Sequence, residues 1–150
     1  MELQICHVGD QNGAPLFSVV RSGDLKRTAP VSLPSPVSFP VGDGAERGLL
    51  PRLRWYLEGY LQAPFGAYRQ SAQAVAETLQ AWGGAVFDRL FVGQAQNWYQ
   101  TARGQSFRDF RIKITSDSPE IMAWPWEALY SREDGYLALR FPVERQFSTA

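Results

Sequence analysis

Apolar and polar residues alternate along the first forty positions of the chain. The β-rich segments LQICHV and LFSVVRS flank the pair Asn12-Gly13, which favours a tight turn with positive φ, so residues 2–22 are predicted to form a β-hairpin. The next segment, residues 30–41, contains four prolines and places apolar residues at Val31, Leu33, Val37, Phe39 and Val41. Because proline cannot donate a ladder hydrogen bond, this segment is predicted to be an edge strand or an extended strap.

The hydrophobic period becomes helical from residue 50. LPRLRWYLEGYLQ carries an apolar stripe, with Arg54 and Glu58 spaced to pair on its exposed side, and APFG is expected to end the helix. A second stripe starts at Tyr68 and continues past Gly83-Gly84 to Phe91. This segment is either one long helix or two helices joined at the glycine pair. We expect QAQNWYQTAR to form a further short helix.

Strand spacing returns near the C-terminus. FRIKIT alternates apolar and polar residues and is predicted to be a half-buried strand. In SDSPE, either Asp117 or Ser118 is expected to cap a helical turn that begins at Pro119. EDGYLALRF is expected to form an Asp-Gly turn at Gly135 and a last strand.

This order of elements predicts an α/β or α+β fold. We expect an N-terminal hairpin and strap, three to four central helices, and further strands on one mixed sheet. The 150 residues suit a single domain. Its expected parts are the strands and strap (1–49), the helical layer (50–104), and the strand, capped turn and C-terminal strand (105–150).

Composition and charge narrow the functional classes. The chain is 45% hydrophobic and 20% charged, as a folded globular protein is, but aromatic residues reach 13%. Aromatic residues at that density indicate a thick core or a surface that a partner covers. The formal net charge is zero and no long basic run is present, so nucleic-acid binding is not expected. No apolar run approaches the ~18 residues of a membrane span. The N-terminus lacks a signal-peptide pattern, so a cytoplasmic protein is expected.

Candidate catalytic chemistry is sparse in this sequence. Cys6 and His7 are the only thiol and the only imidazole, and adjacent residues on a strand point to opposite faces, so they are not expected to form a catalytic dyad. A lone His and a lone Cys do not make a zinc site. The glycine pairs lack a phosphate-binding spacing. We therefore predict no catalytic, cofactor-binding or metal-binding residue, and no cofactor.

The stretch AWPWEALY places a carboxylate among large apolar residues. If Pro125 begins a helical turn, Glu127 can accept hydrogen bonds from free backbone N–H groups and meet the positive end of the helix dipole, so a capping role is favoured. Trp124 and Trp126 are expected to pack against the long helices. The less favoured alternative is an independent enzyme that uses paired carboxylates. The other candidate carboxylates for it are Asp117, Glu120, Glu133 and Asp134.

Several segments taken together resemble the N-terminal part of CHAT-domain proteins, which are bacterial caspase-like cysteine peptidases. They are RWYLE, WGGAVFDRLF, the strand that ends in SD, and PWEALY with GYLALR, and they span roughly residues 50–140. The structural signature of this resemblance comprises Asp117, Trp124, Pro125, Trp126, Glu127 and Gly135.

The resemblance implies a degenerate, non-catalytic caspase-like half-domain that supports or regulates a catalytic half. The nucleophilic Cys and its His partner of that family lie beyond the PWE block, so no position here receives them, and Cys6 and His7 do not correspond to them. The implied partner is a catalytic caspase-like half, and self-association through exposed apolar surface is expected for the isolated chain. The alternative is a self-sufficient protein-binding or regulatory module without enzymatic activity. Its proposed contact is the strap, through Val37, Phe39 and Val41.

Overall fold

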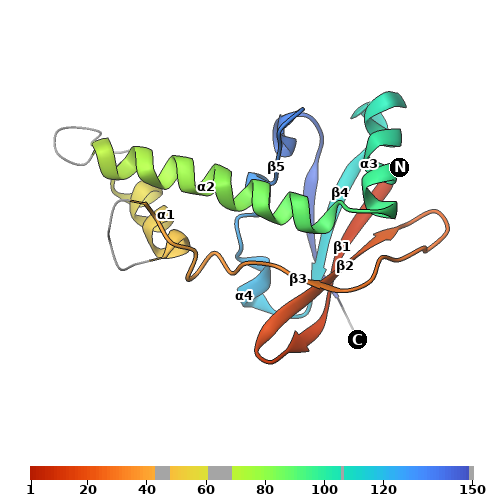
Figure 1. Ribbon diagram of the computed structural model, residues 1–150, viewed down its shortest axis with the longest axis horizontal. Helices are drawn as coiled ribbons and strands as arrows, with labels where there is room; N and C mark the ends of the chain where they lie inside the picture. Colours follow the sequence, from red (N-terminus) through yellow and green to blue (C-terminus); the bar gives the residue numbers. More distant parts are fainter. Residues whose placement is uncertain (43–47, 61–68, 106, 149–150) are drawn as a thin grey trace.

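The computed structural model describes residues 1–42, 48–60, 69–105 and 107–148 (Figure 1). Strands β1 (Glu2–Gln11) and β2 (Ala14–Arg21) form the predicted antiparallel hairpin. Its turn residues Asn12 and Gly13 both have positive φ, at 53° and 79°. The Asn-Gly pair accepts this conformation at low cost, and the hairpin is therefore determined locally.

One mixed sheet organises the described residues, as the predicted α/β class requires. Its order is β3-β2-β1-β4-β7, with β3 (Val31–Ser32), β4 (Arg111–Ser116) and β7 (Val143–Phe147). The β1–β2 and β2–β3 pairs are antiparallel, whereas β1–β4 and β4–β7 are parallel. The two edges of the sheet are thus β3 and β7.

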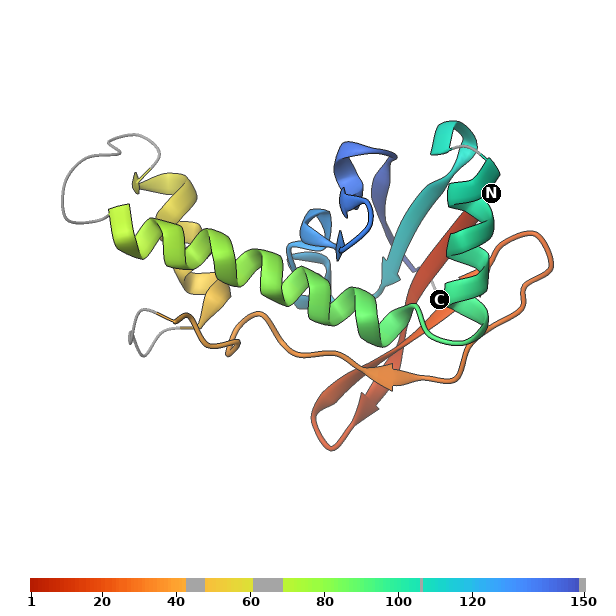
Figure 2. The same ribbon diagram turned by 45° about the horizontal axis from the view of Figure 1, so that its top comes forward.

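Four α-helices are present within the described residues: α1 (Leu49–Glu58), α2 (Arg69–Leu90), α3 (Gln94–Gln105) and α4 (Pro119–Met122). Helix α2 runs unbroken through Gly83 and Gly84, so the glycine pair does not divide it. Helix α1 ends before Gly59, and the predicted APFG terminator lies outside the described residues. The strap follows α2 along much of its length from β3 toward α1 (Figures 1 and 2).

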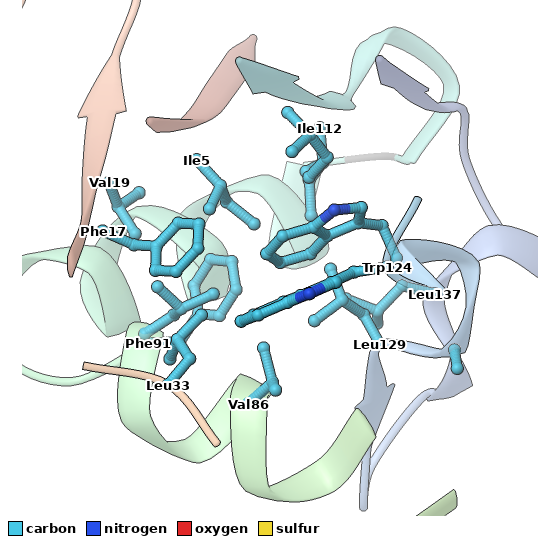
Figure 3. Packing of buried hydrophobic residues seen from close by; sticks show 14 of the residues in the cluster. Ile5, Phe17, Val19, Leu33, Val86, Phe91, Ile112, Trp124, Leu129 and Leu137 are labelled. Atoms are coloured by element: carbon cyan, nitrogen blue, oxygen red, sulfur yellow. The ribbon is translucent and has the colours of Figure 1, made fainter. Parts of the chain in front are cut away.

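The two faces of the sheet differ in chemistry. The face under the helices buries apolar residues of four strands, and Figure 3 shows several of them around Trp124; the strand residues are Leu3, Ile5, Phe17, Val19, Ile112, Ile114 and Val143. On the opposite face, Lys113 lies 3.5 Å from Glu2, and Arg111 lies 3.6 Å from Glu144. On β4 and β7 that face is polar and paired, as expected of a face in contact with water. On β2 it instead carries Ser18 and Val20, which are both buried.

The predicted C-terminal strand in EDGYLALRF is wrong beyond its first residues. The Asp-Gly turn is present: residues 132–134 connect β5 (Tyr130–Ser131) to β6 (Gly135–Tyr136), and Gly135 has a φ of 75°. A 3-10 helix, η5 (Leu137–Leu139), then replaces the strand. Its turn lets Leu137 and Phe141 both enter the core while Leu139 is 84% exposed, whereas a strand would place all three on one face. The last strand is β7 instead.

Candidate functional site

The tryptophans of AWPWEALY are core residues, as predicted. Trp124 and Trp126 are buried, and each makes an edge contact with Trp82 of α2, with ring centroids 6.1 and 6.3 Å apart. The Trp126 indole N–H donates a hydrogen bond to the Ile121 carbonyl over 2.8 Å. Both rings are thus held in the core, and the indole N–H of Trp126 is satisfied within the protein.

Helix α2 approaches this block unusually closely at Gly83. A Cβ atom at Gly83 would lie 1.7 Å from the carbonyl oxygen of Ala128, the last residue of the 3-10 helix η4 (Trp126–Ala128). Only glycine permits that approach. The neighbouring Gly84 has no such restriction, since its Cβ would meet only the Tyr130 ring at 3.9 Å.

Glu127 does not act chiefly as a helix cap, and this corrects the prediction. Its carboxylate forms a two-pronged ion pair with Arg145 of β7, in which Nη2 lies 2.6 Å from Oε2 and Nη1 contacts Oε1. The Arg145 guanidinium holds the pKa of Glu127 below its ordinary value, and the backbone N–H of Glu127 contributes less. Arg145 also donates to the carbonyls of Met122 (2.8 Å) and Trp124 (3.0 Å). Arg145 thereby attaches β7 to the aromatic block.

The cap of α4 is Ser118 and not Asp117. The Ser118 hydroxyl accepts a hydrogen bond from the backbone N–H of Ile121 at 3.4 Å, and Pro119 occupies the first turn of the helix as predicted. Asp117 is exposed. Of the six predicted signature residues, Trp124 to Glu127 lie together, whereas Asp117 and Gly135 lie on separate turns.

An apolar groove of about 820 Å³ separates α1 from the α4–η4 segment. Two ion pairs border it: Arg145 with Glu127 on one side, and Arg54 with Glu58, 3.2 Å apart, on the other. Leu57 and Val37 are 54% and 52% exposed. The apolar lining residues are Val37, Leu50, Pro51, Leu53, Leu57, Ala123, Trp124 and Pro125.

The α1 side of this groove was not anticipated from the sequence. The helical stripe of α1 is only partly covered: Leu49 is fully buried, Leu53 and Tyr56 are half-buried against the core, and Leu57 is exposed. Leu50, Leu53 and Leu57 line the groove at positions i, i+3 and i+7 of one helix face. The helical spacing of the apolar residues in α1 is confirmed, but the described residues do not cover the side of α1 that faces the groove.

The strap residues Val37, Phe39 and Val41 fall into three different environments. Val41 is buried, Phe39 is half-buried against the core, and Val37 opens into the groove. The segment is a two-residue edge strand followed by an extended strap, so both predicted descriptions hold in part. Of the three, Val37 alone is available to a partner.

A hydrogen-bonded chain links His7 to a serine that the sequence reading did not pair with it. His7 Nδ1 lies 2.9 Å from Ser116 Oγ, and His7 Nε2 lies 3.1 Å from Asp10 Oδ1. The order Ser–His–Asp resembles a nucleophilic triad, but Ser116 is fully buried and its oxygen also accepts the Ser118 backbone N–H at 2.9 Å. A substrate cannot reach that oxygen. The chain of bonds instead joins the ends of β1 and β4 to the start of α4.

A second polar cluster surrounds Asp134. This buried carboxylate accepts hydrogen bonds from the Tyr99 hydroxyl at 2.5 Å and from Arg103 Nε at 2.9 Å. Burial alone would raise the pKa of Asp134, but these two hydrogen bonds outweigh it and lower the pKa. The pKa of Tyr99 is raised by its burial and by the hydrogen bond to Asp134. Each polar group has a partner in the protein, so the cluster fastens the β5–β6 turn to α3.

Neither a metal-binding cluster nor a membrane-spanning helix is found in the part of the chain that the structure describes. No group of three or more His, Cys, Asp and Glu side chains is arranged there to hold a metal ion. None of the helices described has both the length and the apolar character needed to cross a bilayer. The groove, with its apolar lining and the exposed side chains of Val37 and Leu57, is the candidate functional site.

Three comparisons with known proteins found no match to a family model, to a curated protein or to a solved structure.

Proposed function

We propose that this chain is a non-catalytic protein-binding module whose groove accepts an amphipathic helix of a partner. The observation that carries the proposal is the face of α1 that lines the groove, where Leu50, Leu53 and Leu57 recur at helical spacing opposite Trp124 and Pro125, and where the described residues leave Leu57 exposed. A stripe at this spacing is complementary to the apolar face of a second helix. An apolar surface of this kind on a folded chain indicates a partner that covers it.

The CHAT resemblance supplies the identity of the proposed partner. In that reading the partner is a catalytic caspase-like half, and this chain supports or regulates it by packing against it. The alternative is a self-sufficient regulatory module that binds an unrelated protein in the same groove. We place the protein in the cytoplasm in both cases, because its single cysteine, Cys6, is a free thiol that suits a reducing compartment.

The groove itself is tested with an anilinonaphthalene sulfonate dye, which fluoresces on exposed apolar surface. We expect the full chain to bind the dye and Leu57→Asp to abolish most of that signal, because a carboxylate would enter the groove. Leu25→Asp is the matched control, since Leu25 is 74% exposed and does not line the groove. Absence of dye binding, or equal loss of signal in both variants, would overturn the groove as a docking site.

The identity of the partner is tested by reading the gene beyond the codon for Ala150. An in-frame continuation that encodes a separated His and Cys, and that binds this chain when the two are expressed together, supports the caspase-like reading. Leu57→Asp should weaken that binding at least about tenfold, as expected for a residue at the centre of an interface. A reading frame without such residues would reject the catalytic half and leave the regulatory module.

A further inference from the structure

Strand β7 leaves one row of backbone groups without a partner among the described residues. The Ile112 N–H donates to the Pro142 carbonyl at 3.0 Å, and the Ser148 N–H donates to the Ser116 carbonyl at 3.0 Å. In a parallel ladder the residues that bond one neighbour alternate with those that face away from it. The even-numbered residues of β7 therefore bond β4. The N–H and C=O groups of Val143, Arg145 and Phe147 point outward.

This edge lacks several of the devices that prevent strand pairing. Proline, an inward-pointing lysine and a bulge are absent from residues 143–147, and Phe147 is more than half exposed. The one basic residue, Arg145, is turned toward Glu127 and two carbonyls. Its charge is neutralised within the molecule and does little to repel a second strand.

We propose that β7 pairs with β7 of a second copy of this chain, antiparallel and centred on Arg145. The sequence VERQF is self-complementary about that residue, with apolar residues at both ends and polar residues between. In this register Val143 lies opposite Phe147 of the second copy, on the helix-covered face, in an apolar cross-strand pair that occurs twice. The outward groups of the three odd-numbered residues form about six hydrogen bonds.

The polar residues of β7 also fit this register. Glu144 lies opposite Gln146 of the second copy, so that an amide N–H can donate to a carboxylate on each side of the two-fold axis. At the two-fold axis, each Arg145 is paired with Glu127 of its own copy. The two ion pairs that meet at the axis therefore carry no net charge. The apolar lining of the groove takes no part in this contact, although the Glu127–Arg145 pair borders both. The inference thus stands apart from the proposed helix-binding function.

The dimer is tested by sedimentation equilibrium of the full chain. A single strand pair is a small interface, so a dissociation constant on the order of 10 to 100 µM is expected. Phe147→Pro removes one outward N–H and the exposed ring, and should abolish the dimer. A chain that remains monomeric to about 500 µM, well above that constant, would overturn the proposal.

The register is tested with two substitutions that do not alter the backbone. Gln146→Lys places an ammonium opposite Glu144 and should tighten the dimer, whereas Gln146→Glu places like charges together and should weaken it. The cross-strand pair occurs twice, so each change should be about two- to thirty-fold. The thermal stability of the dilute monomer should be equal in the two variants, because Gln146 is exposed. Equal dimer affinities in the two variants, or a dimer that Leu57→Asp disrupts, would contradict pairing at β7.

Discussion

Strands β3 and β7 form the two edges of one sheet, yet the hydrogen bonding of their outward backbone groups differs. Along β3 and the strap, backbone carbonyls accept hydrogen bonds from helix side chains: the Ser32 carbonyl accepts one from Arg89 Nε at 2.7 Å, and the Pro34 carbonyl accepts one from the Trp82 indole N–H at 2.8 Å. Phe39 accepts the backbone N–H of Leu49 at 2.8 Å. At β7, by contrast, the outward groups have no such partners in the described part of the chain.

This difference shows that proline content alone does not identify a binding edge. The strap resembled an interaction segment in the sequence because its prolines keep it out of a regular ladder. Those prolines also let it follow α2, whose side chains then bond its carbonyls. A strand of ordinary composition, VERQF, retains the free edge.

The largest effect is expected at Gly83, where α2 packs directly on the backbone of η4. Gly83→Ala should destabilise the protein by about 3 kcal/mol or more, because the new methyl group meets the Ala128 carbonyl and the backbone must move. The matched variant Gly84→Ala should stabilise by about 0.5–1 kcal/mol, since alanine is preferred in a helix and the site has room. Chemical denaturation measures both. Equal effects in the two variants would refute the close approach.

A smaller loss of stability should distinguish the buried part of the strap, at Leu33, from its exposed part, at Val37. Leu33→Ala should cost about 2–4 kcal/mol because Leu33 is buried in the core, whereas Val37→Ala should stay within about 0.5 kcal/mol. The midpoint of urea unfolding reports both values. A large loss in Val37→Ala would mean that the strap is closed along its whole length and that the groove is not open at Val37.

Local chemistry explains which parts of the fold could be predicted. The Asn12-Gly13 hairpin and the cap at the start of α4 depend on residues within a few positions of one another, and both are present. The alternation in FRIKIT identified β4 for the same reason. Strand β7 was missed because an edge strand tolerates polar residues, so VERQF carries little hydrophobic alternation. Its parallel pairing with β4 is also distant in sequence.

The candidate site is built from residues that lie too far apart in the sequence for hydrophobic periodicity to relate them. The stripe on α1 was visible, but only the tertiary arrangement shows that it is left half-exposed beside Pro125. The partner of Glu127 is Arg145, eighteen positions away, and nothing in the sequence singles out that arginine. Likewise, Tyr99 and Asp134 are thirty-five positions apart. Such pairs are formed by the fold as a whole.

The smallest effect in this series concerns the ion pair that attaches β7 to the aromatic block. The folded-state pKa of Glu127 is lowered, so its contribution to stability is present above the unfolded value of about 4.3 and is lost as the pH falls through the folded value. At neutral pH, Glu127→Gln should therefore cost at most about 1 kcal/mol, because the carboxylate is half-exposed.

The pH dependence of that difference distinguishes the ion pair from a simple loss of packing. Unfolding free energies of the wild type and of Glu127→Gln should converge as the pH falls below the lowered folded-state pKa of Glu127, where both side chains are uncharged. In an Arg145→Gln background the difference at neutral pH should largely disappear, since the guanidinium that lowers the pKa is gone. A difference that persists unchanged from neutral pH into acid would show that Glu127 acts through its shape. The attachment of the open edge would then rest on the Arg145 bonds to the Met122 and Trp124 carbonyls alone.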